Sequence, residues 1–278
     1  MMNMQLERVQ KPLRQMRKSL KRLSPDPPPE TVHKLRTRAR HIEAIAAALS
    51  EPGEKRAQRL LKSIKPVRKA AGNVRDMDVL TGNVLSLPQD GYRESLLRLV
   101  ERLGIERQKS AGDLVDAVDQ QRKAARRILK QYAKLVRSAL ADQGPGPSDT
   151  AQAHSVLHIR AVIQDRVHEL SQGPTLTAHN LHPFRLKVKE LRSILQLLPP
   201  TDPAANAALI AALGEVKDKI GEWHDWLQLA ETARKILDPA DDRALLKKID
   251  QVGKQKFRQG LASANNLRKR YLRPPSIR

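Results

Sequence analysis

Two histidines of the chain, His33 and His182, are each followed three residues later by an arginine and 43 residues later by an aspartate. Guanidinium groups bind phosphate oxygens through a planar fork of donors, and a nearby imidazole adds a further donor, or a cation below about pH 6.5. A magnesium-dependent phosphotransferase needs several convergent carboxylates, so we interpret Asp76 and Asp225 as acids that orient a neighbouring cation. These residue types therefore indicate binding of a phosphate-like anion.

The same residues belong to an internal repeat. A shift of 149 residues aligns positions 32–80 with 181–229 without a gap, and nine aligned residues are identical. Gly72 and Gly221 are aligned as well. A repeat at constant spacing indicates duplication of a structural unit. We therefore expect two related halves that carry equivalent sites.

Helical projection places the basic residues of the first half on one strip. At about 100° per residue, His33, Arg36 and Arg40 lie close together and away from the apolar face. A turn near residue 52 brings the next helix back antiparallel, so that Gly72 lies near His33 and indicates close helix approach. The predicted anion-binding residues of this half are His33, Arg36, Arg40, Lys65, Arg68, Lys69 and Arg75.

The second half carries a corresponding strip. Its predicted residues are His182, Arg185, Lys189, Arg192, Lys217 and His224. Arg192 aligns with Glu43, the acidic residue that interrupts the first strip. If the halves pack about a pseudo-two-fold axis, the two strips face each other and form a basic groove or channel. Cations on such a lining repel one another, and a bound polyanion would relieve that repulsion.

Apolar residues recur at helical spacing along the whole chain, and we find no alternating strand pattern. Proline- and glycine-rich breaks separate the predicted helices. We expect helices near residues 3–23, 30–49, 54–86, 92–141, 150–172, 178–198, 204–237 and 241–272, with a break near Gly112. The predicted fold is all-α, with a first helical-bundle repeat over 1–142, a linker over 143–149 and a second repeat over 150–278.

The composition restricts the class of partner. The chain has 278 residues, with 52 Lys and Arg against 30 Asp and Glu, and a formal net charge of +22. Both halves carry the excess, so we expect a polyanion held by the folded part. With two Trp, three Tyr and two Phe, the chain has few rings on which bases could stack. A nucleic-acid-binding protein that contacts only the phosphate backbone remains the alternative.

The sequence lacks the signatures of several other classes of protein. The absence of cysteine excludes disulfides, thiolate nucleophiles and cysteine zinc sites, and it fits a cytoplasmic location. No apolar stretch approaches the length of a membrane span. We find no glycine-rich phosphate loop, metalloprotease motif or nucleophile elbow, so we expect no metal, no cofactor and no catalytic activity. A phosphohydrolase is the weaker alternative.

The repeated motifs resemble the CHAD family, the conserved-histidine α-helical domain. The matching segments are VHKLRTRARHI at 32–42, GNVRDMDVL at 72–80, LHPFRLKVKEL at 181–191 and GEWHDWLQL at 221–229. The resemblance covers nearly the whole chain. It implies two pseudo-symmetric four-helix bundles around a basic central groove or pore. It also implies non-catalytic binding of inorganic polyphosphate, with targeting to polyphosphate granules as a further option.

The resemblance also implies roles for individual residues. Phosphate contacts carry over to all residues of the two strips named above except Lys69 and His224, which rest on the helical geometry alone. The chain departs from the family pattern at Glu43, where a basic residue is commoner. It departs again at Gly214, which aligns with Lys65. Both departures imply an asymmetric or weaker patch at these positions.

Overall fold

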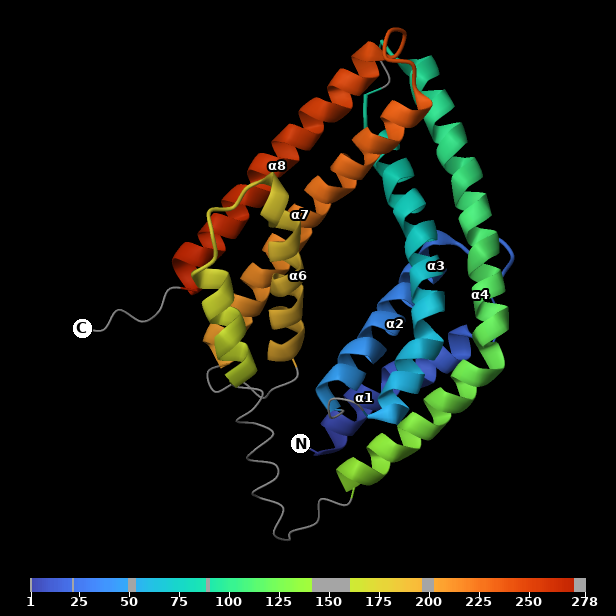
Figure 1. Cartoon of the computed structure of the whole chain (residues 1–278), viewed down its shortest axis with the longest axis vertical. Helices are drawn as coiled ribbons and strands as arrows, with labels where there is room; N and C mark the ends of the chain where they lie inside the picture. Colours follow the sequence, from blue (N-terminus) through green and yellow to red (C-terminus); the bar gives the residue numbers. More distant parts are fainter. Residues whose placement is uncertain are drawn as a thin grey trace, which may run out of the picture. The chain divides into compact units, whose positions relative to one another are not determined.

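The computed structural model describes residues 2–21, 23–49, 54–88, 91–141, 161–196 and 203–272, and these residues form helices without any strand. This confirms the predicted all-α class. Residues 161–171 form a short helical segment ahead of α6. The long helices of Figure 1 are α1 (Met2–Ser19), α2 (Pro29–Leu49), α3 (Lys55–Leu85), α4 (Arg93–Ala141), α6 (Ala178–Leu195), α7 (Pro203–Ile236) and α8 (Arg243–Tyr271).

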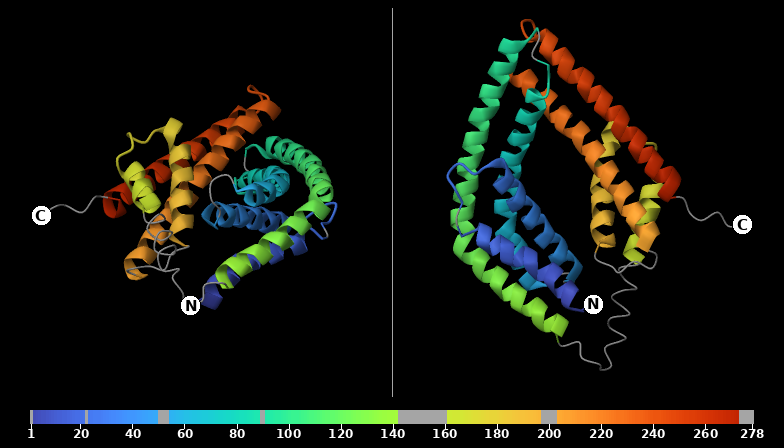
Figure 2. Two further views of the ribbon diagram at one scale, coloured as in Figure 1. Left: turned by 60° about the horizontal axis from the view of Figure 1, so that its bottom comes forward. Right: turned by 180° about the vertical axis from the view of Figure 1, so that it is seen from behind.

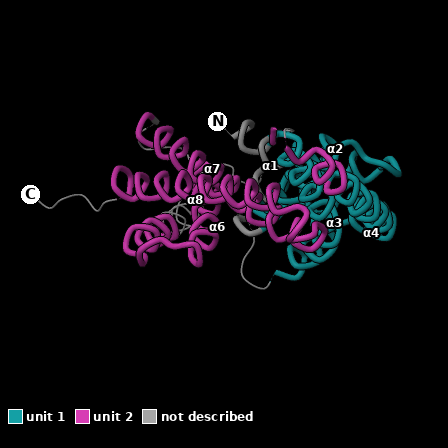
Figure 3. Tube along the Cα trace, turned by 90° about the horizontal axis from the view of Figure 1, so that it is seen from above, with its two compact units in different colours: residues 1–86, 100–146 teal, residues 87–99, 147–278 magenta. Residues whose placement is uncertain are grey.

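The chain divides into two compact units, coloured separately in Figure 3. Unit 1 contains residues 1–86 and 100–146, and unit 2 contains residues 87–99 and 147–278. Residues 87–99 belong to unit 2, whereas our sequence-based boundary assigns them to the first repeat. The predicted linker over 143–149 lies outside the described residues. Tandem duplication of a bundle remains a prediction.

The segment 87–99 is fixed within unit 2 by a buried carboxylate. The side chain of Asp242 accepts hydrogen bonds from the Ser95 hydroxyl and the Arg98 guanidinium. It also accepts one from the backbone N–H of Asp238, at 2.9 Å. Three donors on one carboxylate lower the pKa of Asp242 and keep it ionised. This contact joins the start of α4 to the turn between α7 and α8.

The core of unit 1 is built from one apolar face of each of its helices. α1 packs on α2, and α2 packs on α3, as Figures 1 and 2 show. On α2 the buried residues recur at helical spacing, as Leu35, Ala39, Ile42 and Ala46. α4 adds buried residues such as Leu114 to the same cluster. The burial of this face leaves the basic strip of α2 on the opposite side.

α4 continues through Gly112, so the predicted break there is wrong. The glycine is exposed, and a methyl group in its place would meet no neighbour within 4 Å. A mid-helix glycine costs up to about 1 kcal/mol relative to alanine. The adjacent Ala111 and Leu114 are buried in the unit 1 core. Because burial of one leucine side chain contributes roughly 2 kcal/mol, packing outweighs this local cost.

The core of unit 2 lies among α6, α7 and α8. α6 packs on α7, and α7 packs on α8. The buried cluster includes Leu181 and Phe184 on α6, Trp223 on α7 and Leu267 on α8. α6 begins at a cap in which the backbone N–H of Thr177 donates to the side-chain oxygen of Asn180 at 2.7 Å. This cap fixes the start of α6, close to the first residues of the second strip.

Arg268 connects the end of α8 to the segment before α6. Its Nε donates to the carbonyl of Leu170 at 2.8 Å, and its Nη1 donates to the carbonyl of Pro174 at 2.9 Å. Its guanidinium carbon lies 5.0 Å from the centre of the Phe184 ring, at cation–π distance. Arg268 therefore has a structural role in unit 2.

Candidate anion-binding site

Arg185 is held in a fixed position on the surface of α7. Its Nε donates a hydrogen bond to the backbone carbonyl of Lys217 at 3.0 Å. Its guanidinium lies against Gly221, where a methyl group would come within 2.7 Å of Nη2. Only glycine leaves room for this contact. The nearest neighbour of this glycine is the arginine side chain, and not the histidine that the antiparallel register places there.

Arg36 has the corresponding position in unit 1. A methyl group on Gly72 would lie 3.7 Å from the Arg36 Nε, which is an ordinary van der Waals distance. The Nη2 of Arg36 lies 3.9 Å from Oδ1 of Asp76. The same pair of positions thus brings an arginine onto a helical glycine in both units. The contact in unit 1 is looser than the one in unit 2.

Asp76 lies where we expected an acid that orients an arginine. Burial raises the pKa of its carboxyl group, while the positive charges of Arg36, Arg40 and Arg75 act in the opposite direction. A half-buried carboxylate among three guanidinium groups stabilises their close spacing. The geometry therefore supports a positioning role for Asp76.

The two strips differ at the position shared by Glu43 and Arg192. In unit 1, the Nε of Arg68 donates to Oε1 of Glu43 at 2.6 Å, so one cation of the strip is neutralised. In unit 2, the aligned Arg192 donates through its Nε to the carbonyl of Ile210 at 3.4 Å. The side chain of Arg192 also lies against Gly214, 3.5 Å from the position of an added methyl group. Unit 2 therefore has a guanidinium where unit 1 has an internal ion pair.

His182 on α6 and His224 on α7 form a ring pair in unit 2. Their ring centroids are 4.3 Å apart, and the ring planes are tilted by 33°. Burial lowers the pKa of His224 to about 4, and the charges of His182 and Arg185 contribute. Burial also lowers the pKa of His182, followed by the charges of Arg185 and Lys189. Both rings are therefore uncharged at neutral pH.

Comparison with known proteins identifies the family. The family model of the CHAD domain matches residues 7–234, which include both pairs of motifs. The chain belongs to the CHAD family. The crystal structure of the CHAD domain from the plant Ricinus communis is similar in fold, with a TM-score of 0.56 and 17% sequence identity. The similarity covers 99% of this chain and 86% of that one. No curated protein matches the chain.

The predicted residues of this CHAD domain lie on four helices. The residues on α2 and α3 are His33, Arg36, Arg40, Lys65, Arg68, Lys69 and Arg75, and those on α6 and α7 are His182, Arg185, Lys189, Arg192, Lys217 and His224. The side chains of His33, Lys65 and Lys69 are exposed, and the others are half-buried. Lys217 forms an ion pair with Asp218 at 2.8 Å. The shortest polar contacts of the two strips are therefore the ion pairs of Arg68 with Glu43 and of Lys217 with Asp218.

Sequence reasoning missed Arg107, which lies outside the motifs of this CHAD domain and connects three segments of unit 1. Its Nε donates to Asp78 at 2.7 Å, and its Nη1 donates to Asp26 at 2.6 Å. Its Nη2 donates to the carbonyl of Pro27 at 2.7 Å. Arg107 thereby fixes the loop before α2 to α3 and α4. The Asp78 side chain is 4% exposed and engaged by this arginine, which supports a structural role rather than magnesium binding.

Two further classes of site are not found in the described part of this CHAD domain. No three His, Asp or Glu side chains among the described residues lie together as a metal site would require. None of the helices there has the length and apolar character needed to cross a bilayer.

Proposed function

We propose that this CHAD domain binds inorganic polyphosphate and does not hydrolyse it. The observation that carries the proposal is the equivalent placement of Arg36 and Arg185, each against a helical glycine in its own unit. A guanidinium held by helix backbone is oriented before a ligand arrives, so less conformational entropy is lost on binding. Phosphate oxygens match the donor fork of arginine, and the net charge of +22 favours a polymer over a single phosphate.

The binding energy in this proposal comes from many similar contacts. Each phosphate neutralised by a lysine or arginine releases counterions, so affinity falls steeply with rising salt. Two strips on one chain can hold segments of one polymer, and the second contact then benefits from a high effective concentration. Inorganic polyphosphate has no bases, which fits a chain with few aromatic residues.

The carboxylates near the strips support binding rather than hydrolysis. Asp76 lies 3.9 Å from the guanidinium of Arg36, and Asp78 accepts a hydrogen bond from Arg107. These acids are occupied in positioning arginines. Phosphoryl transfer assisted by magnesium uses carboxylates that converge on the metal ion instead.

A competition experiment tests this proposal. Labelled long-chain polyphosphate is bound to the full chain at about 150 mM salt. Unlabelled polyphosphate, single-stranded DNA, RNA and heparin are then added at equal concentrations of anionic groups. We expect displacement by polyphosphate alone. Equal displacement by DNA or RNA would favour the nucleic-acid alternative, and phosphate release in the presence of magnesium would favour a phosphohydrolase.

A matched pair of variants tests the site. We expect the double variant Arg36→Ala with Arg185→Ala to weaken polyphosphate binding by a factor of roughly 100 or more, since each lost charge-assisted contact contributes about 1.5 kcal/mol or more. The control is Lys247→Ala, an exposed lysine on α8. Similar losses in both variants would mean diffuse charge attraction. In cells, we propose that the protein associates with polyphosphate granules, and the same double variant should then fail to do so.

A further inference from the structure

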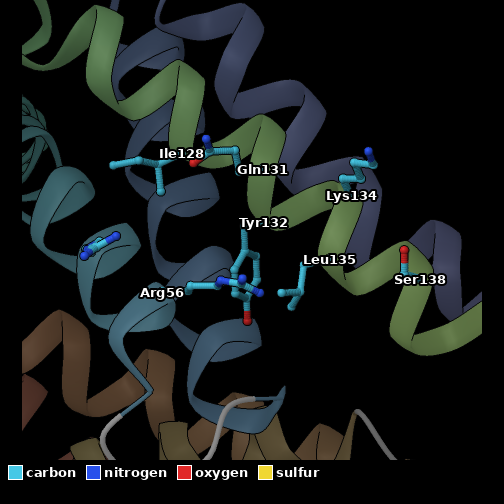
Figure 4. A pocket seen from close by; sticks show the side chains of 8 residues that line it. Arg56, Ile128, Gln131, Tyr132, Lys134, Leu135 and Ser138 are labelled. Atoms are coloured by element: carbon cyan, nitrogen blue, oxygen red, sulfur yellow. The ribbon is translucent and has the colours of Figure 1, made fainter.

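A cationic pocket apart from the two strips lies within unit 1, between α3 and α4 (Figure 4). Its volume is about 730 Å³. Arg56 and Arg59 line it from α3, and Ile128, Tyr132, Lys134 and Leu135 line it from α4. Pockets of roughly 300–1,000 Å³ hold small organic molecules. The volume is therefore sufficient for a metabolite-sized ligand.

The pocket is separate from the strip on α3. At about 100° per residue, Arg56 and Arg59 lie roughly 140–160° around the helix from Gly72, which faces Arg36. Arg56 is also about 24 Å from Gly72 along the helix axis, given a rise of 1.5 Å per residue. None of the residues that line this pocket belongs to the proposed polyphosphate site.

Three cationic side chains line this pocket. Arg56, Arg59 and Lys134 make no ion pair with any described residue, in contrast to Arg68 and Arg107 of the same unit. No described lining residue is acidic. Gln131 and Ser138 add uncharged polar groups to the lining. The positive charge in this pocket is therefore available to an anion.

The other wall of the pocket is apolar, and one of its residues belongs to the core. Ile128, Tyr132 and Leu135 recur at helical spacing on one side of α4. Tyr132 is 3% exposed and belongs to the buried core cluster of unit 1. Figure 4 shows Arg56, Tyr132 and Leu135 at the same cavity. A bare phosphate chain would leave the partly exposed Ile128 and Leu135 uncovered, whereas a ligand with an apolar body would bury them.

We propose that this pocket binds a small organic anion, with a phosphate or carboxylate head group on Arg56, Arg59 and Lys134 and an apolar body against Ile128, Tyr132 and Leu135. The two arginines offer donor forks to the head group. The apolar body supplies a hydrophobic contribution that inorganic polyphosphate lacks. The assignment is independent of polyphosphate binding and concerns a different ligand class.

A fluorescent probe of the same chemistry tests the pocket. The probe 8-anilinonaphthalene-1-sulfonate has an apolar aromatic body and one sulfonate, and its emission rises in an apolar environment. We expect the double variant Arg56→Ala with Arg59→Ala to weaken probe binding to the full chain by roughly tenfold, since charge-assisted hydrogen bonds are lost. The matched control is Lys109→Ala with Lys123→Ala, two exposed lysines on α4 outside the pocket lining. All four residues are exposed, so circular dichroism should show unchanged helix content.

The outcomes distinguish binding in this pocket from nonspecific binding of the probe. Equal effects of the two double variants, or no effect of either, would overturn the assignment. So would equally tight binding of N-phenyl-1-naphthylamine, which lacks the sulfonate, or displacement of the probe by polyphosphate at the same phosphate concentration. Displacement by adenosine monophosphate would identify a phosphate head group, and displacement by laurate a carboxylate. Failure of both competitors at millimolar concentration would also overturn it.

Discussion

The imidazole rings of His182 and His224 stack across α6 and α7, with 4.3 Å between their centroids. Burial lowers the pKa values of both rings, and the positive charge of Arg185 lowers them further. The Nδ1 atom of His182 is buried without a hydrogen-bond partner among the described residues. An anion beside Arg185 would add negative charge next to both rings and raise their pKa values. Anion binding in unit 2 is therefore expected to take up protons.

The first prediction concerns the pH dependence of affinity. If the complex has higher histidine pKa values than the free protein, acidification favours the complex, and the gain stops below the free pKa of about 4 for His224. We expect polyphosphate to bind more tightly as pH falls from about 7 toward 5. Titration calorimetry at pH 6 in buffers of different ionisation enthalpy measures the proton uptake. The variant His182→Asn with His224→Asn should abolish it, and unchanged uptake in that variant would contradict the assignment.

The second prediction concerns stability without a ligand. The pKa of His224 is about 4 in the folded state and 6.5 in the unfolded state, so between these values the unfolded chain binds a proton that the folded chain does not. The free energy of unfolding should therefore be highest above about pH 6.5 and decrease as pH falls toward 4. Urea unfolding monitored by the fluorescence of Trp223 and Trp226 measures this slope. The His224→Asn variant should make the slope shallower; an identical slope would exclude His224 as its source.

The third prediction compares the two glycines. A methyl group at Gly221 would come within 2.7 Å of the Arg185 guanidinium, but a methyl group at Gly72 would lie 3.7 Å from Arg36. Gly221→Ala should therefore displace Arg185 and weaken polyphosphate binding roughly five- to tenfold. Gly72→Ala is the matched control and should change affinity less than about twofold. Because alanine is the better helix former, neither variant should reduce thermal stability by much. Equal binding losses would show that Arg185 has no special position.

The fourth prediction concerns the ion pair in unit 1. Glu43→Gln removes the charge that neutralises Arg68, so affinity for polyphosphate should rise and its salt dependence should become steeper. The stability should change by less than about 1 kcal/mol, since the pair is partly exposed. Arg192→Glu, which installs the unit 1 residue in unit 2, should lower affinity. Binding isotherms at several salt concentrations measure both effects. Lower affinity in Glu43→Gln would contradict the idea that Glu43 limits the first strip.

The fifth prediction concerns Arg107. Arg107→Ala leaves the buried carboxylate of Asp78 without its partner, and we expect a loss of roughly 2–4 kcal/mol in the free energy of unfolding. The aligned residue of Asp78 in unit 2 is Leu227. Replacing the pair together, as Asp78→Leu with Arg107→Met, should recover most of the loss, because an apolar pair avoids the buried charge. Urea unfolding of the single and double variants tests this, and a double variant as unstable as Arg107→Ala would contradict it.

Much of the fold follows from local signals in the sequence. Proline and glycine breaks separate the helices, and the spacing of Leu35, Ala39 and Ile42 identifies the buried face of α2. The break expected at Gly112 is absent because packing of the neighbouring residues in the core outweighs the helix propensity of one glycine. The assignment of residues 87–99 to unit 2 depends on the bonds of Ser95 and Arg98 to Asp242, far along the sequence. No local pattern reveals such contacts.

The candidate site, like the fold, follows only in part from the sequence. The repeat and the antiparallel register place the two helical glycines beside the histidines, whereas the structure places Gly72 against Arg36 and Gly221 against Arg185. The negative charge of Glu43, at the position aligned with Arg192, indicated that Glu43 interrupts the first strip. The stacking of His224 on His182 was not predicted, although the antiparallel register places it one turn from Gly221. Arg107 lies outside the aligned segment 32–80, and only the tertiary structure reveals its bond to Asp78.

The fixed position of Arg185 has a consequence for how a polymer would move. Its Nε donates a hydrogen bond to the carbonyl of Lys217, which restrains the guanidinium at one place on α7. A chain of identical phosphates offers the same group to Arg185 at every step. The bound polyphosphate is therefore expected to slide past the arginine one phosphate at a time, exchanging its register without leaving the protein.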